Sequence, residues 1–251
     1  MNPTLKSFLR AWLPRTIRRQ HILAGPLRGQ HIVTSWHDYP AAILGRTERL
    51  LLDWFDTNVG SGETWLDVGA HYGYTAIALS RLVGPSGRVF AFEPTVSTAG
   101  YLSQTRLLNH FPQLTVLPLA LGAPKDLELK QLPTVRGMVD STKQEGEWIE
   151  TILVARLDWL WPKICGRRER VDGIKIDVQG MELEVLRGMA ELLKAFKPKL
   201  VVEVHYGVDR SEFLNLIETL GYSGRGVPVE PIEGEVEPQY VDNRSYAFPV
   251  A

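Results

Sequence analysis

Short apolar runs alternate with longer amphipathic stretches from residue 64 onward. Each run ends near an acid or a glycine, which is typical of buried parallel strands joined by crossover helices. The runs that predict strands are Thr64–Val68, Arg88–Glu93, Leu114–Leu119, Gly173–Val178 and Leu200–His205. The stretches that predict helices are Thr75–Leu82, Thr95–His110, Leu157–Ile164 and Glu182–Phe196. This repeated alternation predicts an α/β fold with a Rossmann-like, doubly wound parallel sheet.

The pattern changes outside these repeats. Asp209 and Ser211 suit the start of a helix that Gly221 ends, and the stretch Tyr222–Val250 has a strand-like segment at each end, which favours a C-terminal antiparallel hairpin. A helix is also expected over Ala41–Phe55. The polar stretch Ala123–Glu150, interrupted by prolines, is expected to be an irregular insertion beside the sheet.

Composition and charge narrow the class of protein. The chain has 251 residues, a net charge of −1 and a single cysteine, Cys165, so an intramolecular disulfide is impossible and a reducing, cytoplasmic location is expected. Residues 1–37 carry six basic and no acidic side chains, whereas residues 38–251 carry 22 basic and 29 acidic ones. An acidic body argues against a nucleic-acid partner. No pattern in the sequence predicts an oligomeric state.

The basic leader is broken by Pro14 and lacks the apolar run of a signal peptide or a membrane-spanning helix. We favour a helix between Leu5 and Leu27 that packs on the protein's own core. The alternative is a peripheral contact of residues 1–28 with a membrane surface, at its inner face, through an amphipathic segment. The expected organisation is a basic extension and cap over residues 1–44, followed by one domain over residues 45–251.

The first predicted strand runs into a turn with glycines at Gly69 and Gly73. Ligands of open α/β sheets bind at such turns, but the spacing is not the G-x-G-x-x-G of a pyrophosphate-binding turn. Glu93 ends the neighbouring strand, where a carboxylate can accept two hydrogen bonds from ribose hydroxyls. A nucleoside without a phosphate site is therefore expected, which S-adenosylmethionine satisfies better than NAD.

These residues carry a family resemblance that covers about residues 45–220. The segments Leu66–Tyr74, Ala91–Pro94, Ala120–Gly122, Ile174–Glu182, Val185–Gly188 and Val202–His205 resemble, in order, those of FkbM-type class I methyltransferases. The resemblance implies a class I methyltransferase sheet and S-adenosylmethionine-dependent O-methylation of a hydroxyl on a small-molecule or glycan acceptor, such as a sugar or a polyketide. Two positions depart from the family pattern: His71 stands where Asn is usual, and Gln179 where Glu is usual.

The resemblance also implies roles for single residues. The cofactor's amino-acid tail would lie against Asp67, Gly69, Ala70, His71 and Gly73, its ribose at Glu93 next to Pro94, and its adenine against Ala120 and Leu121. Asp177 would face the methyl group, which makes it both a cofactor contact and a catalytic candidate.

Glu203 and His205 are two positions apart on the last predicted strand, so their side chains share one face. His205 is the first candidate for the general base, because the ordinary pKa of histidine is closest to neutrality. Asp177 and Glu203 could instead hold Mg²⁺, which we do not favour because two acids alone are weak support. The segment Thr34–Tyr39 and the insertion Ala123–Glu150 are expected to lie over the acceptor, or simply to pack.

The sequence therefore predicts an S-adenosylmethionine-dependent O-methyltransferase. An N- or carboxyl-methyltransferase with the same cofactor pocket is one alternative. A non-catalytic nucleoside-binding module is the other, because Gln179 stands where an acid is expected.

Overall fold

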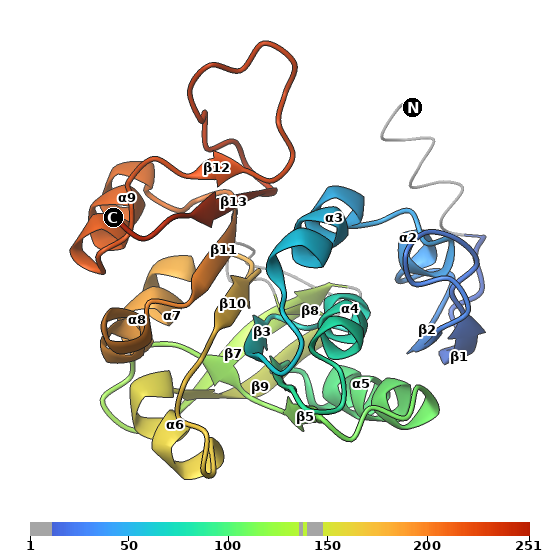
Figure 1. Ribbon diagram of the computed structural model, residues 1–251. Coiled ribbons are helices and arrows are strands. Elements are labelled where there is room, and N and C mark those ends of the chain that lie inside the picture. The colour runs from blue at the N-terminus through green and yellow to red at the C-terminus, as the bar shows by residue number, and fades with distance from the viewer. Residues whose placement is uncertain (1–11, 136–137, 140–147) are drawn as a thin grey trace.

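The computed structural model describes residues 12–135, 138–139 and 148–251. Its main sheet has seven strands in the order β12-β13-β11-β10-β3-β4-β5 (Figure 1). Their bounds are β3 Thr64–Val68, β4 Arg88–Phe92, β5 Leu114–Leu117, β10 Gly173–Ile176, β11 Lys199–Val204, β12 Val227–Pro228 and β13 Arg244–Phe248. The strands β5, β4, β3, β10 and β11 are parallel, and the chain order reverses between β3 and β10. Ligands of open α/β sheets bind at such a reversal.

Helices cover both faces of this sheet (Figure 1). One face packs against α3 Arg49–Asn58, α4 Tyr74–Val83 and α5 Val96–Leu108, and the other against α6 Leu157–Ile164, α7 Glu182–Gly188, α8 Ala190–Phe196 and α9 Arg210–Thr219. Alternate residues of each strand enter opposite cores: Leu66 and Val68 pack with α7, and Trp65 packs with α3. The predicted doubly wound α/β fold is therefore confirmed.

Four strands end earlier than the hydrophobic runs predict. The strands end at Phe92, Leu117, Ile176 and Val204, one or two residues before the ends of the runs. As a result, Glu93 and Asp177 lie just beyond the strand ends, where a side chain can face a ligand.

The predicted C-terminal hairpin is present. β13 pairs antiparallel with both β12 and β11, and Tyr222 forms an isolated bridge with Val250. The long connection between β12 and β13 is tied back by Arg244, whose guanidinium forms a buried, bidentate ion pair with Glu235.

The prediction of a helix between Leu5 and Leu27 is wrong for the described residues, which begin at residue 12. β1 Arg18–His21 pairs antiparallel with β2 His31–Thr34, which makes a separate two-stranded hairpin. The side chains of α5 hold it: the backbone N–H of Val33 donates to the Thr105 hydroxyl (2.9 Å), and that of His31 donates to Asn109 Oδ1 (2.8 Å). These hydrogen bonds fix the backbone of β2, so the segment forms a hairpin instead of the expected helix. Residues 1–11 of the leader lie outside the described part.

The insertion is more regular than the sequence predicts. β6 Ala120–Leu121, β7 Glu128–Val135, β8 Met138–Val139 and β9 Trp148–Ala155 form a second, four-stranded sheet in the order β6-β9-β7-β8. The prolines of this stretch favour a loop on sequence grounds, but Pro133 lies within β7 opposite Ile149. The pairing of β7 with β9 therefore outweighs the local signal. Residues 136–137 and 140–147 are outside the description.

Two expected helices are each divided in two. The first becomes α2 Pro40–Ile43 and α3, because Gly45 and Glu48 between them have left-handed backbone conformations (φ 65° and 52°). The second becomes α7 and α8, because the Asp158 carboxylate of α6 accepts hydrogen bonds from the backbone N–H groups of Glu191 and Leu192 (3.1 and 3.0 Å) and so caps a new helix start.

Within the described part of the chain, none of the helices has the length and apolar character to cross a membrane. The membrane contact of residues 1–28 and the domain boundary at residue 45 stay predictions.

Candidate active site

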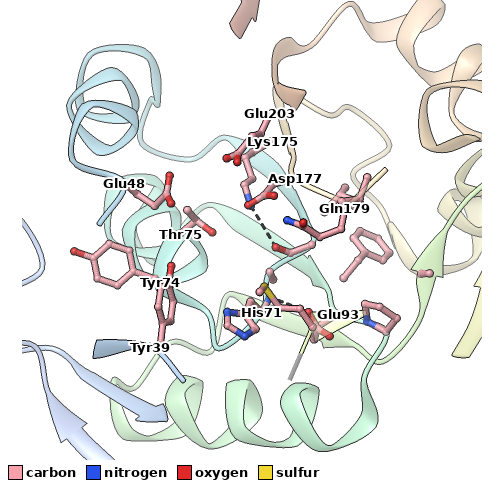
Figure 2. A pocket seen from close by; sticks show the side chains of 18 of the residues that line it. Tyr39, Glu48, His71, Tyr74, Thr75, Glu93, Lys175, Asp177, Gln179 and Glu203 are labelled. Atoms are coloured by element: carbon pink, nitrogen blue, oxygen red, sulfur yellow. Dashed lines mark hydrogen bonds and ion pairs between the residues drawn. The ribbon is translucent and has the colours of Figure 1, made fainter. Parts of the chain in front are cut away.

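A cavity of about 300 Å³ lies at the carboxyl ends of β3, β4 and β10 (Figure 2). Its walls come from the turns after these strands, from β11, from β6, and from residues 38–41 and 47–48. It therefore occupies the reversal of strand order, and residues on both sides of the expected boundary at residue 45 contribute to it.

Glu93 is the buried carboxylate at one end of this cavity. Its Oε2 accepts a hydrogen bond from the backbone N–H of His71 (2.9 Å), and its Oε1 accepts one from the backbone N–H of Thr95 (2.9 Å). Burial raises its pKa to about 7 in spite of these hydrogen bonds. Because each oxygen has a second lone pair, Glu93 can also accept the two hydroxyls of a ribose.

The two turn glycines both have left-handed backbone conformations, with φ of 81° at Gly69 and 92° at Gly73. An added Cβ would lie 1.8 Å from the backbone oxygen of Asp177 at Gly69, and 2.1 Å from Leu102 Cδ1 at Gly73. These glycines therefore let the turn pack against the protein's own neighbouring segments.

Most of the residues predicted for the site line the cavity, and three do not. Those in its wall are Gly69, Ala70, His71, Glu93, Pro94, Ala120, Leu121, Asp177 and Glu203. Asp67, Gly73 and His205 lie behind the wall, where they contact lining residues instead of the space itself. Asp38 and Tyr39 from the predicted covering segment and Met138 from the insertion also reach the cavity.

Lys175 is a lining residue that the sequence analysis missed. Its Nζ lies 3.3 Å from each of Asp67 Oδ1, Asp177 Oδ2 and the backbone oxygen of Gly69. Burial alone would lower the pKa of this ammonium, but the carboxylates of Asp177 and Asp67 raise it instead. The signal was present in the sequence, because a lysine inside an apolar central strand needs buried acidic partners.

His205 is fully buried among acids, which changes the role that the sequence predicted for it. Its Nδ1 lies 2.6 Å from Glu182 Oε1, and its Nε2 lies 3.3 Å from Glu203 Oε1 and 3.4 Å from Asp177 Oδ1. Burial opposes the charged form, but the hydrogen bonds with Glu182 and Glu203 outweigh it and raise the pKa of His205 to about 10. An imidazole that is already protonated at neutral pH cannot take up a proton from an acceptor hydroxyl.

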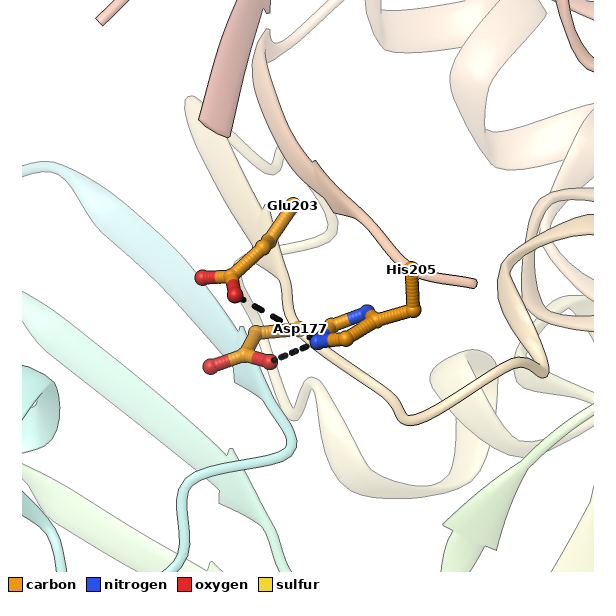
Figure 3. Close-up of side chains that lie close together, drawn as sticks. All are labelled: Asp177, Glu203 and His205. Atoms are coloured by element: carbon orange, nitrogen blue, oxygen red, sulfur yellow. Dashed lines mark ion pairs between the residues drawn. The ribbon is translucent and has the colours of Figure 1, made fainter. Parts of the chain in front are cut away.

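The same residues are the candidate metal cluster. Asp177, Glu203 and His205 place one ligand atom each within 4.8 Å of one another (Figure 3). The positive charges of Lys175 and His205 already lower the pKa of Asp177 against the effect of burial. This charge balance gives no reason to favour Mg²⁺ over the protein's own cations.

His71 and Gln179, the two residues that depart from the family pattern, both lie in the cavity wall. The His71 ring packs between Tyr39 and Tyr72, at centroid distances of 5.1 and 4.2 Å, while its backbone makes the hydrogen bond to Glu93. That hydrogen bond does not depend on the side chain, so histidine can replace asparagine there. The Gln179 amide lies 2.9 Å from His205 Nε2, where a glutamate would add another negative charge.

The far end of the cavity holds two further groups that the sequence analysis did not single out, Glu48 and Tyr74. Figure 2 shows Glu48 on the side away from Glu93, with its carboxylate turned toward Lys175 and Asp177. Burial and then the charges of Asp177 and Glu203 raise the pKa of Glu48 to about 7. Burial, and after it the charge of Glu48, raises the pKa of Tyr74 to about 12.

The fold and the site together define a class I methyltransferase architecture. Glu93, a carboxylate that can bind a nucleoside's ribose, lies where the strand order of the sheet reverses. The family model named Methyltransferase FkbM domain matches residues 67–226. The chain therefore belongs to the FkbM methyltransferase family, and the resemblance seen in the sequence is confirmed.

Known proteins agree with this assignment. The hexuronic acid methyltransferase AglP of Haloferax volcanii is 31% identical over 154 residues, which is 60% of this chain and 59% of that protein. The match thus spans less than two thirds of that relative's length.

Two solved structures share the fold at low sequence identity. A methyltransferase FkbM from Methylobacillus flagellatus has a TM-score of 0.51 at 17% identity, over 78% of this chain and 50% of that chain. The fibrillarin of Aeropyrum pernix, solved with natively bound S-adenosyl-L-methionine, also has a TM-score of 0.51, at 13% identity, over 94% of this chain and 89% of that chain.

Proposed function

We propose that this chain is an S-adenosylmethionine-dependent O-methyltransferase whose acceptor is a hydroxyl of a sugar or glycan. The observation that supports this cofactor most directly is Glu93. It is a buried carboxylate that lines the cavity, and backbone N–H groups donate to both of its oxygens. Family membership and the position of the cavity at the reversal of strand order support the same cofactor.

The residues present fit this cofactor. Glu93 would hold the ribose hydroxyls, Ala120 and Leu121 would lie against the adenine, and Gly69, Ala70 and His71 would surround the amino-acid tail. Asp67 would act indirectly, because it accepts a hydrogen bond from the Thr75 hydroxyl (2.7 Å) and pairs with Lys175. The bound cofactor supplies an electrophilic methyl group on a cationic sulfur.

The protein's own contribution is to position the acceptor and to exclude water. Alignment of two reactants can lower a barrier by about 7–11 kcal/mol. Transfer from a sulfonium also neutralises charge, which favours a cavity with aromatic walls. Tyr39 and Tyr74 supply such a wall, with their ring centroids 6.3 Å apart.

The acceptor class follows from the charges that line the other end. Glu48, Asp177 and Glu203 put three carboxyl groups in the wall, against one lining ammonium, Lys175. An anionic acceptor would be repelled there, whereas a neutral sugar hydroxyl finds hydrogen-bond acceptors. The name of the relative from Haloferax volcanii supports a sugar as the acceptor. A polyketide hydroxyl is the other acceptor that the family resemblance implies.

The second candidate function is methylation of a sugar carboxylate, which the same relative favours because a hexuronic acid carries one. The two products differ in their chemistry: a methyl ether resists mild alkali, whereas a methyl ester is hydrolysed.

The test uses purified full-length protein with methyl-labelled S-adenosylmethionine and two probes, p-nitrophenyl glucoside and p-nitrophenyl glucuronide. We expect label in the sugar product that survives mild alkali. Label that is released by alkali would replace O-methylation of a hydroxyl by carboxyl methylation. Cofactor binding without transfer to either probe would favour a nucleoside-binding module, and the absence of both would overturn the methyltransferase proposal.

A further inference from the structure

The reaction proposed above needs a group that takes up the proton of the acceptor hydroxyl. The candidates are the titratable side chains at the acceptor end of the cavity. They are Glu48 directly before α3, Asp177 after β10, Glu203 on β11, and His205 directly behind them.

Three of these groups are already engaged with charged partners. Both oxygens of Asp177 face a cation, with Oδ2 3.3 Å from Lys175 Nζ and Oδ1 3.4 Å from His205 Nε2. Glu203 Oε1 faces the same His205 nitrogen at 3.3 Å. Lys175 and His205 lower the pKa of Asp177 against the effect of burial, which makes Asp177 a weaker base. Burial and the charge of Asp177 raise the pKa of Glu203, but its Oε1 is occupied by the contact with His205. His205 is enclosed by Glu182, Glu203 and Asp177 and does not reach the cavity.

Glu48 has different surroundings. Among the described residues, its carboxylate accepts one hydrogen bond, from the Thr47 hydroxyl to Oε1 at the long distance of 3.4 Å. Within the described part of the chain its Oε2 has no hydrogen-bond partner, although the side chain lines the cavity and is turned toward Lys175 and Asp177 (Figure 2). This carboxylate is thus available for a hydroxyl that enters the cavity.

The backbone at Glu48 is also unusual. Its φ of 52° and ψ of 26° are left-handed, a conformation that costs a residue other than glycine free energy, and it lies at the position before the first residue of α3. Residues held in such conformations cluster at functional sites. The conformation separates α2 from α3 and sets the side chain in the cavity wall.

A second feature next to Glu48 is the Tyr74 hydroxyl. Tyr74 lines the cavity and is 2% exposed, yet its hydroxyl oxygen is buried without a hydrogen-bond partner among the residues that the structure describes. A buried hydroxyl without a hydrogen bond costs free energy unless a ligand or a water molecule forms that bond. The charge of Glu48 acts on this phenol, so both groups belong to the same end of the cavity.

We propose that Glu48 is the general base that takes up the proton of the acceptor hydroxyl, an inference that rests on the proposed O-methyltransferase function. The acceptor oxygen forms its new bond to the methyl carbon while the carbon–sulfur bond breaks, and the electron pair of that bond stays on the sulfur. The hydroxyl proton passes to a carboxylate oxygen of Glu48 and is later released to water. Glu48 lies before residues 67–226, the segment that the family model matches, so a residue outside that segment would take part in the reaction.

The pKa of Glu48 fits this role. Burial is the largest cause that raises it, Asp177, Glu203 and Glu230 raise it further, and Lys175 lowers it, which leaves it at about 7. The phenols of Tyr39 and Tyr74 face the same carboxylate and are neutral in this range, because burial raises the pKa of each. A general base works best when its pKa is near the operating pH.

The experiment compares the wild type with E48Q, which keeps the shape of the side chain, and E48G, which removes the carboxylate and suits the left-handed backbone. The matched control is D53N, which removes an exposed carboxylate from α3, the helix that begins after Glu48. With the p-nitrophenyl glucoside probe and saturating S-adenosylmethionine, we expect E48Q and E48G to lower kcat about 10²–10⁴-fold. The KM for the probe should stay within a fewfold range, and D53N should match the wild type.

Two further measurements separate catalysis from folding and from cofactor binding. The wild-type rate should rise with pH through an acidic limb that E48Q lacks. In cofactor-free protein labelled with ¹³C at the glutamate carboxyl groups, the carboxyls of Glu48 and Glu93 should both titrate near pH 7 in the wild type and D53N, and one of these two signals should be missing from the E48Q spectrum. A Glu48 carboxyl that titrates in the ordinary glutamate range would overturn the proposal.

The outcomes distinguish the two proposals. An active wild type whose rate and pH profile are unchanged in E48Q would leave the methyltransferase function standing and remove Glu48 as the base. A folded wild type that binds no cofactor and transfers no label would overturn the proposed function, and this inference with it.

Discussion

The two ends of the cavity are built in different ways. The cofactor end comes from one local unit, in which the turn after β3 lies beside the end of β4 and backbone N–H groups hold Glu93. The acceptor end is assembled from segments that are far apart in the chain and is held together by charge, with Lys175 and His205 between several carboxylates. The first end can be identified from a short motif, whereas the second depends on which buried charges meet in the folded protein.

The largest effect in this comparison is expected for His205→Gln, which removes the buried positive charge and leaves Glu182 without its partner. Breaking a buried charge pair costs about 3–5 kcal/mol, so the free energy of unfolding in urea should fall by about that amount at pH 7. His21→Gln, at an exposed position on β1, is the control and should change little. A loss of turnover without a loss of stability would instead return His205 to the role of base.

The pH dependence of this effect has a defined sign. The pKa of His205 is raised from 6.5 in the unfolded chain to about 10 in the fold, so its stabilising contribution is complete below pH 6.5. That contribution decreases above pH 6.5 and is lost as the pH rises through 10. The difference between the wild type and His205→Gln should therefore shrink over this window, and an increase with pH would contradict the charge network.

A smaller effect of opposite sign is expected for Glu48→Gln. The pKa of Glu48 is raised from 4.5 to about 7, so ionisation of this buried acid destabilises the folded state at pH 8, and protonation relieves the cost as the pH falls toward 4.5. Glu48→Gln should therefore stabilise the protein by up to about 3 kcal/mol at pH 8 and by close to nothing near pH 4.5. Urea unfolding at several pH values measures this difference, and a variant less stable than the wild type at pH 8 would contradict it.

The features that could be predicted from the sequence are those that depend on local segments, and the others depend on contacts between distant ones. The parallel sheet, the C-terminal hairpin and the position of Glu93 rest on local hydrophobic runs, so they are visible in the chain. The hairpin of β1 and β2 is not visible, because its strands are fixed by Thr105 and Asn109 on a distant helix. The second sheet is hidden for a related reason: its long pairing of β7 with β9 overrides prolines that favour a loop.

The candidate site shows the same limit. Glu203 and His205 were correctly predicted to share one face, because strand alternation is a local rule. The protonation state of His205 depends on Glu182, which comes from α7, and no spacing rule joins the two. Glu48 carries no motif at all, since its role follows from a break between two helices and from the acids across the cavity.

The central claim is that Glu93 serves the cofactor and Glu48 serves the acceptor. Isothermal titration calorimetry with S-adenosylmethionine tests it on three purified proteins: the wild type, Glu93→Ala and Glu48→Gln. We expect micromolar binding to the wild type, binding weakened well over tenfold in Glu93→Ala, and nearly unchanged affinity in Glu48→Gln. No binding to the wild type, or equal affinity of the wild type and Glu93→Ala, would contradict it.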